Sequence, residues 1–153
     1  MRSRADGDET IAVLAGLPGG PALLDWFGGR PNFGDAEVLG LTLDRRGPST
    51  LRIAVMSTVS GTDARGFYKH AVITFVLADM VDVALEGFSR QNVIAGLILR
   101  RADDRPVHPT QVGVGLALGD HEIELRPCFG AFGTIRATIT SVDLVQADVE
   151  GRE

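Results

Sequence analysis

A two-residue hydrophobic period, which begins near residue 37 and returns in most later segments, constrains this chain more than any other feature. Successive side chains of a β-strand point to opposite faces, so apolar residues at every second position predict a strand with one buried face. The apolar positions of the first two such segments are Leu39, Leu41, Leu43, Leu51, Ile53 and Val55. Further strands are predicted over about 71–77, 81–85, 97–100, 112–118, 122–126 and 135–144.

Turn signals indicate how these strands are connected. Arg46-Gly47-Pro48-Ser49 separates the first two strands and Gly119-Asp120 separates 112–118 from 122–126, so we expect a hairpin at each place. The run 71–77 is apolar at nearly every position, which is typical of a central strand covered on both faces. In the last segment the apolar positions change parity, which predicts a bulge near Ser141.

Helical signals are few. Thr10 is a candidate N-cap for a short helix through Leu17, and a second helix is predicted over about 21–27, with Pro21 in its first turn. Ser89 is a candidate cap for a single helical turn over 90–94, whereas residues 1–9 are too polar to order and are expected to be disordered. The fold class is therefore mainly β (α+β): one domain over 1–153, with about eight mostly antiparallel strands in a curled sheet or sandwich and two short helices.

Composition narrows the classes of partner. Twenty acidic residues against fifteen basic ones give a net charge of -5, which disfavours nucleic-acid binding and suits a basic partner. Cys128 is the single cysteine, so no internal disulfide can form and a cytoplasmic protein is expected. No run approaches the roughly 20 apolar residues of a membrane span, and no export signal is recognised near the start.

Asp35 and Glu37 are the strongest candidates for chemistry. They lie two residues apart at the entrance to a strand, so both carboxylates are expected on the face that buries Leu39 and Leu41. Two carboxylates held close can act as a general acid and base. The structural alternative is that Asp35 accepts hydrogen bonds from a turn and Glu37 pairs with an arginine.

A second block, Glu86-Gly87-Phe88-Ser89-Arg90-Gln91-Asn92, follows a predicted strand. Gln91 and Asn92 either face a partner or satisfy backbone groups where the strand ends, and Phe88 is expected in the core. Asp63 belongs to a polar and aromatic loop that either anchors an interface or packs inward. The three histidines are far apart in sequence and Cys128 has no adjacent histidine, so neither a metal site, a cofactor nor an enzymatic nucleophile is predicted.

Several motifs together resemble the immunity protein 50 family of bacterial toxin–antitoxin loci. They are, in order, Trp26, Phe33, Asp35-Ala36-Glu37-Val38, Leu43-Asp44-Arg45, Asp63-x-x-Gly66-x-Tyr68, His70 and Glu86-Gly87-Phe88 with Gln91-Asn92-Val93. Family members often carry a histidine where this chain has Gly34, and that departure weakens an acid–base or metal role for the Asp35 corner.

The resemblance implies a protein that binds and neutralises a cognate toxin. Either a monomer or a homodimer is compatible with the sequence. The expected contacts of such an inhibitor are Asp35, Glu37, Asp63, Glu86, Gln91 and Asn92. A small-ligand-binding or hydrolytic domain that uses Asp35 and Glu37 is the alternative. It predicts a deep pocket beside those carboxylates, whereas a shallow acidic surface favours inhibition.

Overall fold

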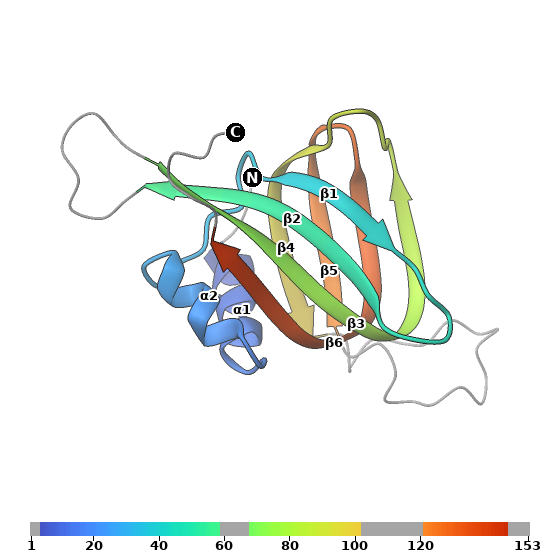
Figure 1. The fold of residues 1–153 in the computed structure, drawn as a ribbon, viewed down its shortest axis with the longest axis horizontal. Coiled ribbons are helices and arrows are strands. Elements are labelled where there is room, and N and C mark those ends of the chain that lie inside the picture. The colour runs from blue at the N-terminus through green and yellow to red at the C-terminus, as the bar shows by residue number, and fades with distance from the viewer. Residues whose placement is uncertain (1–3, 59–67, 102–120, 147–153) are drawn as a thin grey trace.

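Two helices precede six strands in the computed structural model, which describes residues 4–58, 68–101 and 121–146 (Figure 1). The elements are α1 (Arg4–Ala15), α2 (Gly20–Trp26), β1 (Glu37–Thr42), β2 (Ser49–Thr58), β3 (Tyr68–Glu86), β4 (Val93–Arg101), β5 (His121–Phe129) and β6 (Phe132–Gln146). The predicted second helix is confirmed to within one residue at each end.

The strands form a closed barrel in the order β1-β2-β3-β6-β5-β4, and every neighbouring pair is antiparallel. The predicted mainly β, antiparallel fold is therefore confirmed, and the sheet is curled until it closes. Closure depends on a short contact between β1 and β4, where Glu37 lies opposite Val93. There the Val38 amide donates to the Asn92 carbonyl (2.8 Å) and the Ile94 amide donates to the Ala36 carbonyl (2.9 Å).

The described residues contain six strands where about eight are predicted. Segments 71–77 and 81–85 are one continuous strand, β3, because extra residues are absorbed as a bulge between Ala78 and Asp82. Asp79 in this bulge has a φ of 51°, a left-handed conformation that Asp tolerates better than most residues. Segment 112–118 lies outside the described residues.

The hairpin predicted between 112–118 and 122–126 has its first strand and its turn outside the described residues. Its second strand lies in β5, where Glu122 to Leu125 pair with β4 on one edge and with β6 on the other. Local turn chemistry at Gly119-Asp120 indicates a reversal but carries no information about which strands lie beside β5.

The barrel interior is filled by the inward-facing side chains of the strands, and Leu51, Ile53, Ile73, Phe75 and Leu77 have no exposed surface. The predicted bulge in the last strand is confirmed. Ser141 lies opposite Val76 and Ile139 lies opposite Leu77, which leaves Thr140 without a partner in the ladder.

The face predicted for β1 is confirmed for Leu41 but wrong for Leu39 and Leu43. A bulge between Val38 and Gly40 shifts the parity of the strand, so Val38 is buried while Leu39 is 43% exposed. Leu41 still packs against the core, but Leu43 lies in the open at the end of the strand. One inserted residue is enough to move the following side chains to the other face.

Residues 1–3 lie outside the described residues, but the disorder predicted for residues 4–9 and the capping role of Thr10 are both wrong. Helix α1 already begins at Arg4, and Thr10 lies in its middle, where the Oγ1 hydroxyl donates to the Asp6 carbonyl (2.9 Å). Thr10, Val13, Leu14 and Leu17 recur at helical spacing and are buried. Contacts with the barrel thus order a segment whose composition alone does not.

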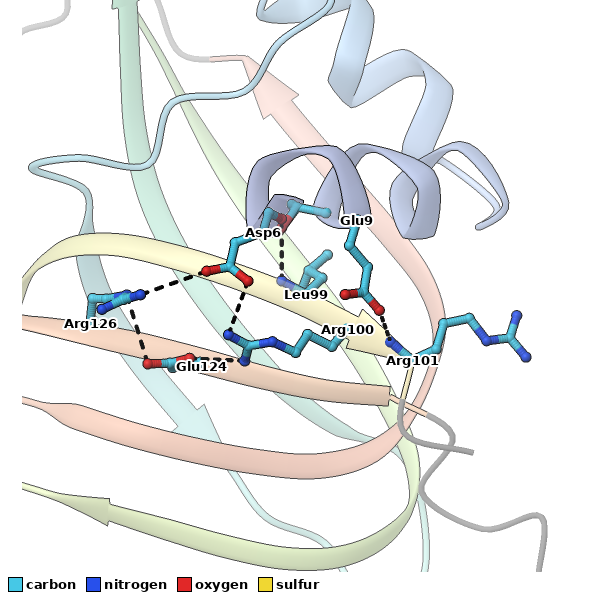
Figure 2. A network of polar contacts seen from close by, with 8 residues as sticks. Asp6, Glu9, Leu99, Arg100, Arg101, Glu124 and Arg126 are labelled. Atoms are coloured by element: carbon cyan, nitrogen blue, oxygen red, sulfur yellow. Dashed lines mark hydrogen bonds and ion pairs between the residues drawn. The ribbon is translucent and has the colours of Figure 1, made fainter. Parts of the chain in front are cut away.

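Helix α1 lies along the edge of β4 that β1 leaves unpaired. Thr10 Oγ1 accepts the Leu99 amide (3.0 Å) and Glu9 Oε2 accepts the Arg101 amide (3.1 Å), as Figure 2 shows for Glu9. The side chains of one helix therefore replace a missing strand neighbour. This edge would otherwise present open amides to other chains.

An ion-pair network joins α1 to β4 and β5 (Figure 2). Arg100 lies 2.9 Å from Glu124 and 3.4 Å from Asp6, and Arg126 lies 3.8 Å from both of these carboxylates. Burial on its own lowers the pKa of Arg100, but the hydrogen bond and charge of Glu124 and the charges of Asp6 and Glu122 outweigh it and raise that pKa.

Helix α2 packs next to α1 and against β6, as Figure 1 shows at the C-terminal end of that strand. Its Leu23 and Trp26 are buried, and the Trp26 and Phe27 rings meet edge to face at 4.9 Å. The Nζ of Lys69 lies 4.8 Å from the centre of the Trp26 ring, which attaches α2 to the start of β3.

Candidate functional site

The predicted carboxylates lie where β1 closes on β4. Asp35 is exposed in a turn with a φ of 65°, and its amide donates to the Ile94 carbonyl (2.9 Å). Ala36 and Val38 are the residues of this segment that enter the core, so Asp35 and Glu37 lie on the outward side. The expectation that both carboxylates share a face with Leu41 is wrong, because the bulge at Leu39 intervenes.

Asn92 holds the loop before β4 in place. It is 8% exposed, and its Oδ1 accepts the amides of Ser89 (2.9 Å) and Ala131 (3.0 Å), while its Nδ2 donates to the Ser89 carbonyl (3.0 Å). These bonds use the side chain within the protein, so the structural role considered for Asn92 is the one observed. The predicted helical turn over 90–94 is absent, because Val93 already begins β4.

The turn between β5 and β6 joins this loop to the end of β3. Gly130 has a φ of 95°, and a Cβ there would lie 2.6 Å from Asn92 Oδ1. Gly87 has a φ of 83°, and a Cβ there would lie 2.6 Å from the Gly130 carbonyl oxygen. Close backbone approach at both glycines therefore brings Glu86, at the end of β3, to the same end of the barrel as Asn92.

An open depression of about 650 Å³ lies at this end of the barrel, and we call it the closure pocket. It is lined by Glu37, Ser89, Arg90, Gln91 and Phe129. All of these residues except Glu37 are exposed, so the depression is shallow. Phe129 is 58% exposed, and Phe88, predicted to be in the core, is 50% exposed.

The closure pocket and its surroundings are acidic and aromatic. Glu37 lines it, Glu86 and Asp35 are exposed on neighbouring segments, and Arg90 is the cation on its rim. Aromatic side chains and arginine are enriched at protein interfaces, and here exposed Phe129 lies beside Arg90. The arrangement is suited to protein contact.

Four of the six predicted site residues, Asp35, Glu37, Gln91 and Asn92, meet at the β1–β4 closure, and Glu86 lies across the β5–β6 turn from them. Asp63 lies outside the described residues. Within the described part of the chain, no group of three or more His, Cys, Asp or Glu side chains is placed to hold a metal ion.

Sequence reasoning missed Phe129 and Arg90. The Phe129-Gly130 pair held a partial signal, because the glycine directly after Phe129 marks it as the end of a strand. Arg90 carried no such signal, since its place on the rim depends on the fold of the 87–92 loop.

A second depression, of about 970 Å³, lies at the other end of β1. It is formed by the β1–β2 turn, including Arg45 and Arg46, and by the bend of β3 at Asp79. None of the predicted site residues lines it.

Comparison of this chain with protein-family models, curated proteins and solved structures finds no match. Neither helix in the described ranges is long and apolar enough to cross a membrane.

Proposed function

We propose that this chain is an immunity protein that binds a cognate bacterial toxin domain and neutralises it by stoichiometric occlusion in the cytoplasm. The observation that carries the proposal is the closure pocket, where exposed Phe129 and partly buried Glu37 flank a shallow depression. The resemblance of the Asp35-Ala36-Glu37-Val38 and Glu86-Gly87-Phe88 segments to the immunity protein 50 family supports the same function.

The pocket suits inhibition because its base is already ordered. Asn92 makes three hydrogen bonds within the chain, and the backbone bonds of Val38 and Ile94 close the barrel beneath it. A preformed surface loses little conformational entropy on binding. The net charge of -5 favours encounter with a basic toxin surface and disfavours nucleic acid as the partner.

A ligand-binding or hydrolytic role for Asp35 and Glu37 is the second candidate. It requires a deep pocket beside both carboxylates, but the depression at Glu37 is shallow and Asp35 does not line it. A shallow acidic surface favours occlusion, so we propose no enzymatic activity.

The proposal is tested by co-expressing this chain with the toxic C-terminal domain encoded beside its gene. We expect growth to be restored and the two proteins to purify as a stable complex in equal amounts. Continued toxicity, together with the absence of a complex between the two purified proteins, would overturn the proposal.

A further inference from the structure

The outward face of β2, β3 and the C-terminal half of β6, which we call the outer face, is largely uncharged. The strand register arranges its residues in rows. Ala54, Val72 and Val145 form one row, and Thr50, Val76 and Ser141 form another. Met56 and Val145 are 44% and 60% exposed, respectively. An outward antiparallel face is ordinarily polar, so this composition is that of an interaction surface.

The outer face is not covered within the described part of the chain. The run 71–77 is apolar at nearly every position, as in a strand covered on both faces, yet its outward residues Val72, Thr74 and Val76 are only half-buried. The buried side chains of α1 and α2 belong to the same core as the barrel interior, so both helices pack on the other side. In Figure 1 no helix lies in front of β2 and β3.

One row of the outer face carries two opposite charges. Arg52 lies opposite Thr74 on β3, and Thr74 lies opposite Asp143 on β6. Arg52 and Asp143 are therefore placed symmetrically about the central strand β3. Their backbones are separated by two strand spacings, about 10 Å. Both side chains are exposed, and neither forms an ion pair or hydrogen bond with another described residue.

We propose that the outer face binds a second copy of this chain, through a two-fold axis that runs roughly along β3 above Thr74. Such an axis exchanges the two flanks of the face. Arg52 of each copy then meets Asp143 of the other, so the symmetric contact contains two ion pairs and no like-charge contact.

The same axis pairs the apolar rows. Ala54 of one copy faces Val145 of the other, while Val72 and Val76 each face their own equivalents. Two sheets stacked in this way lie about 10 Å apart with nearly aligned strands, which is a common sheet packing. The contact would cover Val72 and Val76 on their second side, as the sequence of β3 predicts. The surface buried in this contact comes from three strands of each copy and is small for a stable interface. We therefore expect a dimer dissociation constant in the micromolar range.

A charge-exchange experiment tests this dimer with the purified full chain alone. Sedimentation velocity over concentrations that bracket the micromolar range measures the dimer dissociation constant of the wild type, Arg52→Asp, Asp143→Arg and the double variant. Each single reversal creates two like-charge contacts and is expected to weaken the dimer at least about tenfold. The double variant rebuilds both ion pairs in the opposite sense and is expected to return to within about threefold of the wild type.

Arg90→Asp is the matched control, because it makes the same charge change at an exposed residue of the loop before β4, away from the outer face, and is expected to leave the dimer unchanged. Recovery in the double variant also shows that both substitutions are compatible with the folded chain, and circular dichroism of the single variants checks that each is folded. A chain that is monomeric at every concentration would overturn the proposal, and so would a double variant as weak as the single ones. Because no toxin is present, either result leaves the proposed immunity function standing.

Discussion

At the scale of single residues, Asn92 is the side chain on which the closure pocket depends. Replacing it with Ala leaves the amides of Ser89 and buried Ala131 without their acceptor, so we expect Asn92→Ala to lower the free energy of unfolding by about 2–3 kcal/mol. The neighbouring Gln91 side chain is exposed, and Gln91→Ala is expected to cost less than about 0.5 kcal/mol. Chemical denaturation of the two variants measures the difference, and equal losses would contradict the assigned role.

Individual residues also show where prediction from sequence stops. The two-residue period correctly places Leu51, Ile53 and Val55 in the core, because β2 is regular and the period persists along it. The same reasoning is wrong for Leu39, because a bulge adds one residue to β1 and reverses its faces. Bulges depend on the partner strand, and a short apolar run such as 37–42 does not reveal one. The parity change near Ser141 did reveal a bulge, since apolar residues lie on both sides of it.

At the scale of elements, Thr10 attaches α1 to the unpaired edge of β4. Thr10→Val preserves the shape of the side chain but removes the acceptor of the buried Leu99 amide, so we expect a loss of about 1–3 kcal/mol in the free energy of unfolding. Thr10→Ser keeps the hydroxyl and should retain most of the stability. Thermal and chemical denaturation of both variants tests this, and a Val variant as stable as the wild type would refute the edge contact.

The ion pair of Arg100 with Asp6 also attaches α1 to β4. The pH dependence of its contribution to stability can be derived from the pKa of Arg100. A base whose pKa is raised by folding contributes its stabilisation fully below its unfolded pKa and loses it only as the pH rises through its folded pKa. Both values of an arginine lie far above neutral pH. We therefore expect Arg100→Met to lower the free energy of unfolding by about 1–3 kcal/mol, and this decrease should be constant from about pH 6 to pH 9.

Urea denaturation at several pH values in that range measures the loss for Arg100→Met. Arg90→Met is the control. Because Arg90 is exposed, this substitution is expected to change the free energy of unfolding little. A loss for Arg100→Met that disappears toward pH 9 would contradict the assignment.

The helices and strands differ in how much of them could be predicted. Helix α2 is predicted well because Pro21, Leu23 and Trp26 supply a start and a buried stripe locally. The first turns of α1 are not predicted, because their order depends on distant contacts. Asp6 contacts Arg100 and Arg126, and Glu9 accepts the Arg101 amide, all about 90 or more residues further along the chain. Likewise, the pairing of β5 with β4 and β6 depends on the closed sheet and not on its nearest turn.

At the scale of the whole molecule, barrel closure brings together residues from three separate segments. Glu37 comes from β1, Arg90 and Gln91 from the loop before β4, and Phe129 from the end of β5. The sequence predicts site residues in two of these segments, but only the closed sheet places Phe129 among them. The candidate site is thus predictable in part: its carboxylate and amide were recognised, whereas its aromatic contact follows from topology.

The dissociation constant between the purified chain and the inactivated toxic domain encoded beside its gene tests the central claim most directly. The double variant Glu37→Arg/Phe129→Ser alters the closure pocket, and Asp25→Arg/Leu43→Ser makes the same kinds of change at exposed residues of α2 and the far end of β1. We predict that the pocket variant binds at least about 50-fold more weakly while the control binds like the wild type. Equal affinities for all three proteins would contradict the claim that this surface occludes the toxin.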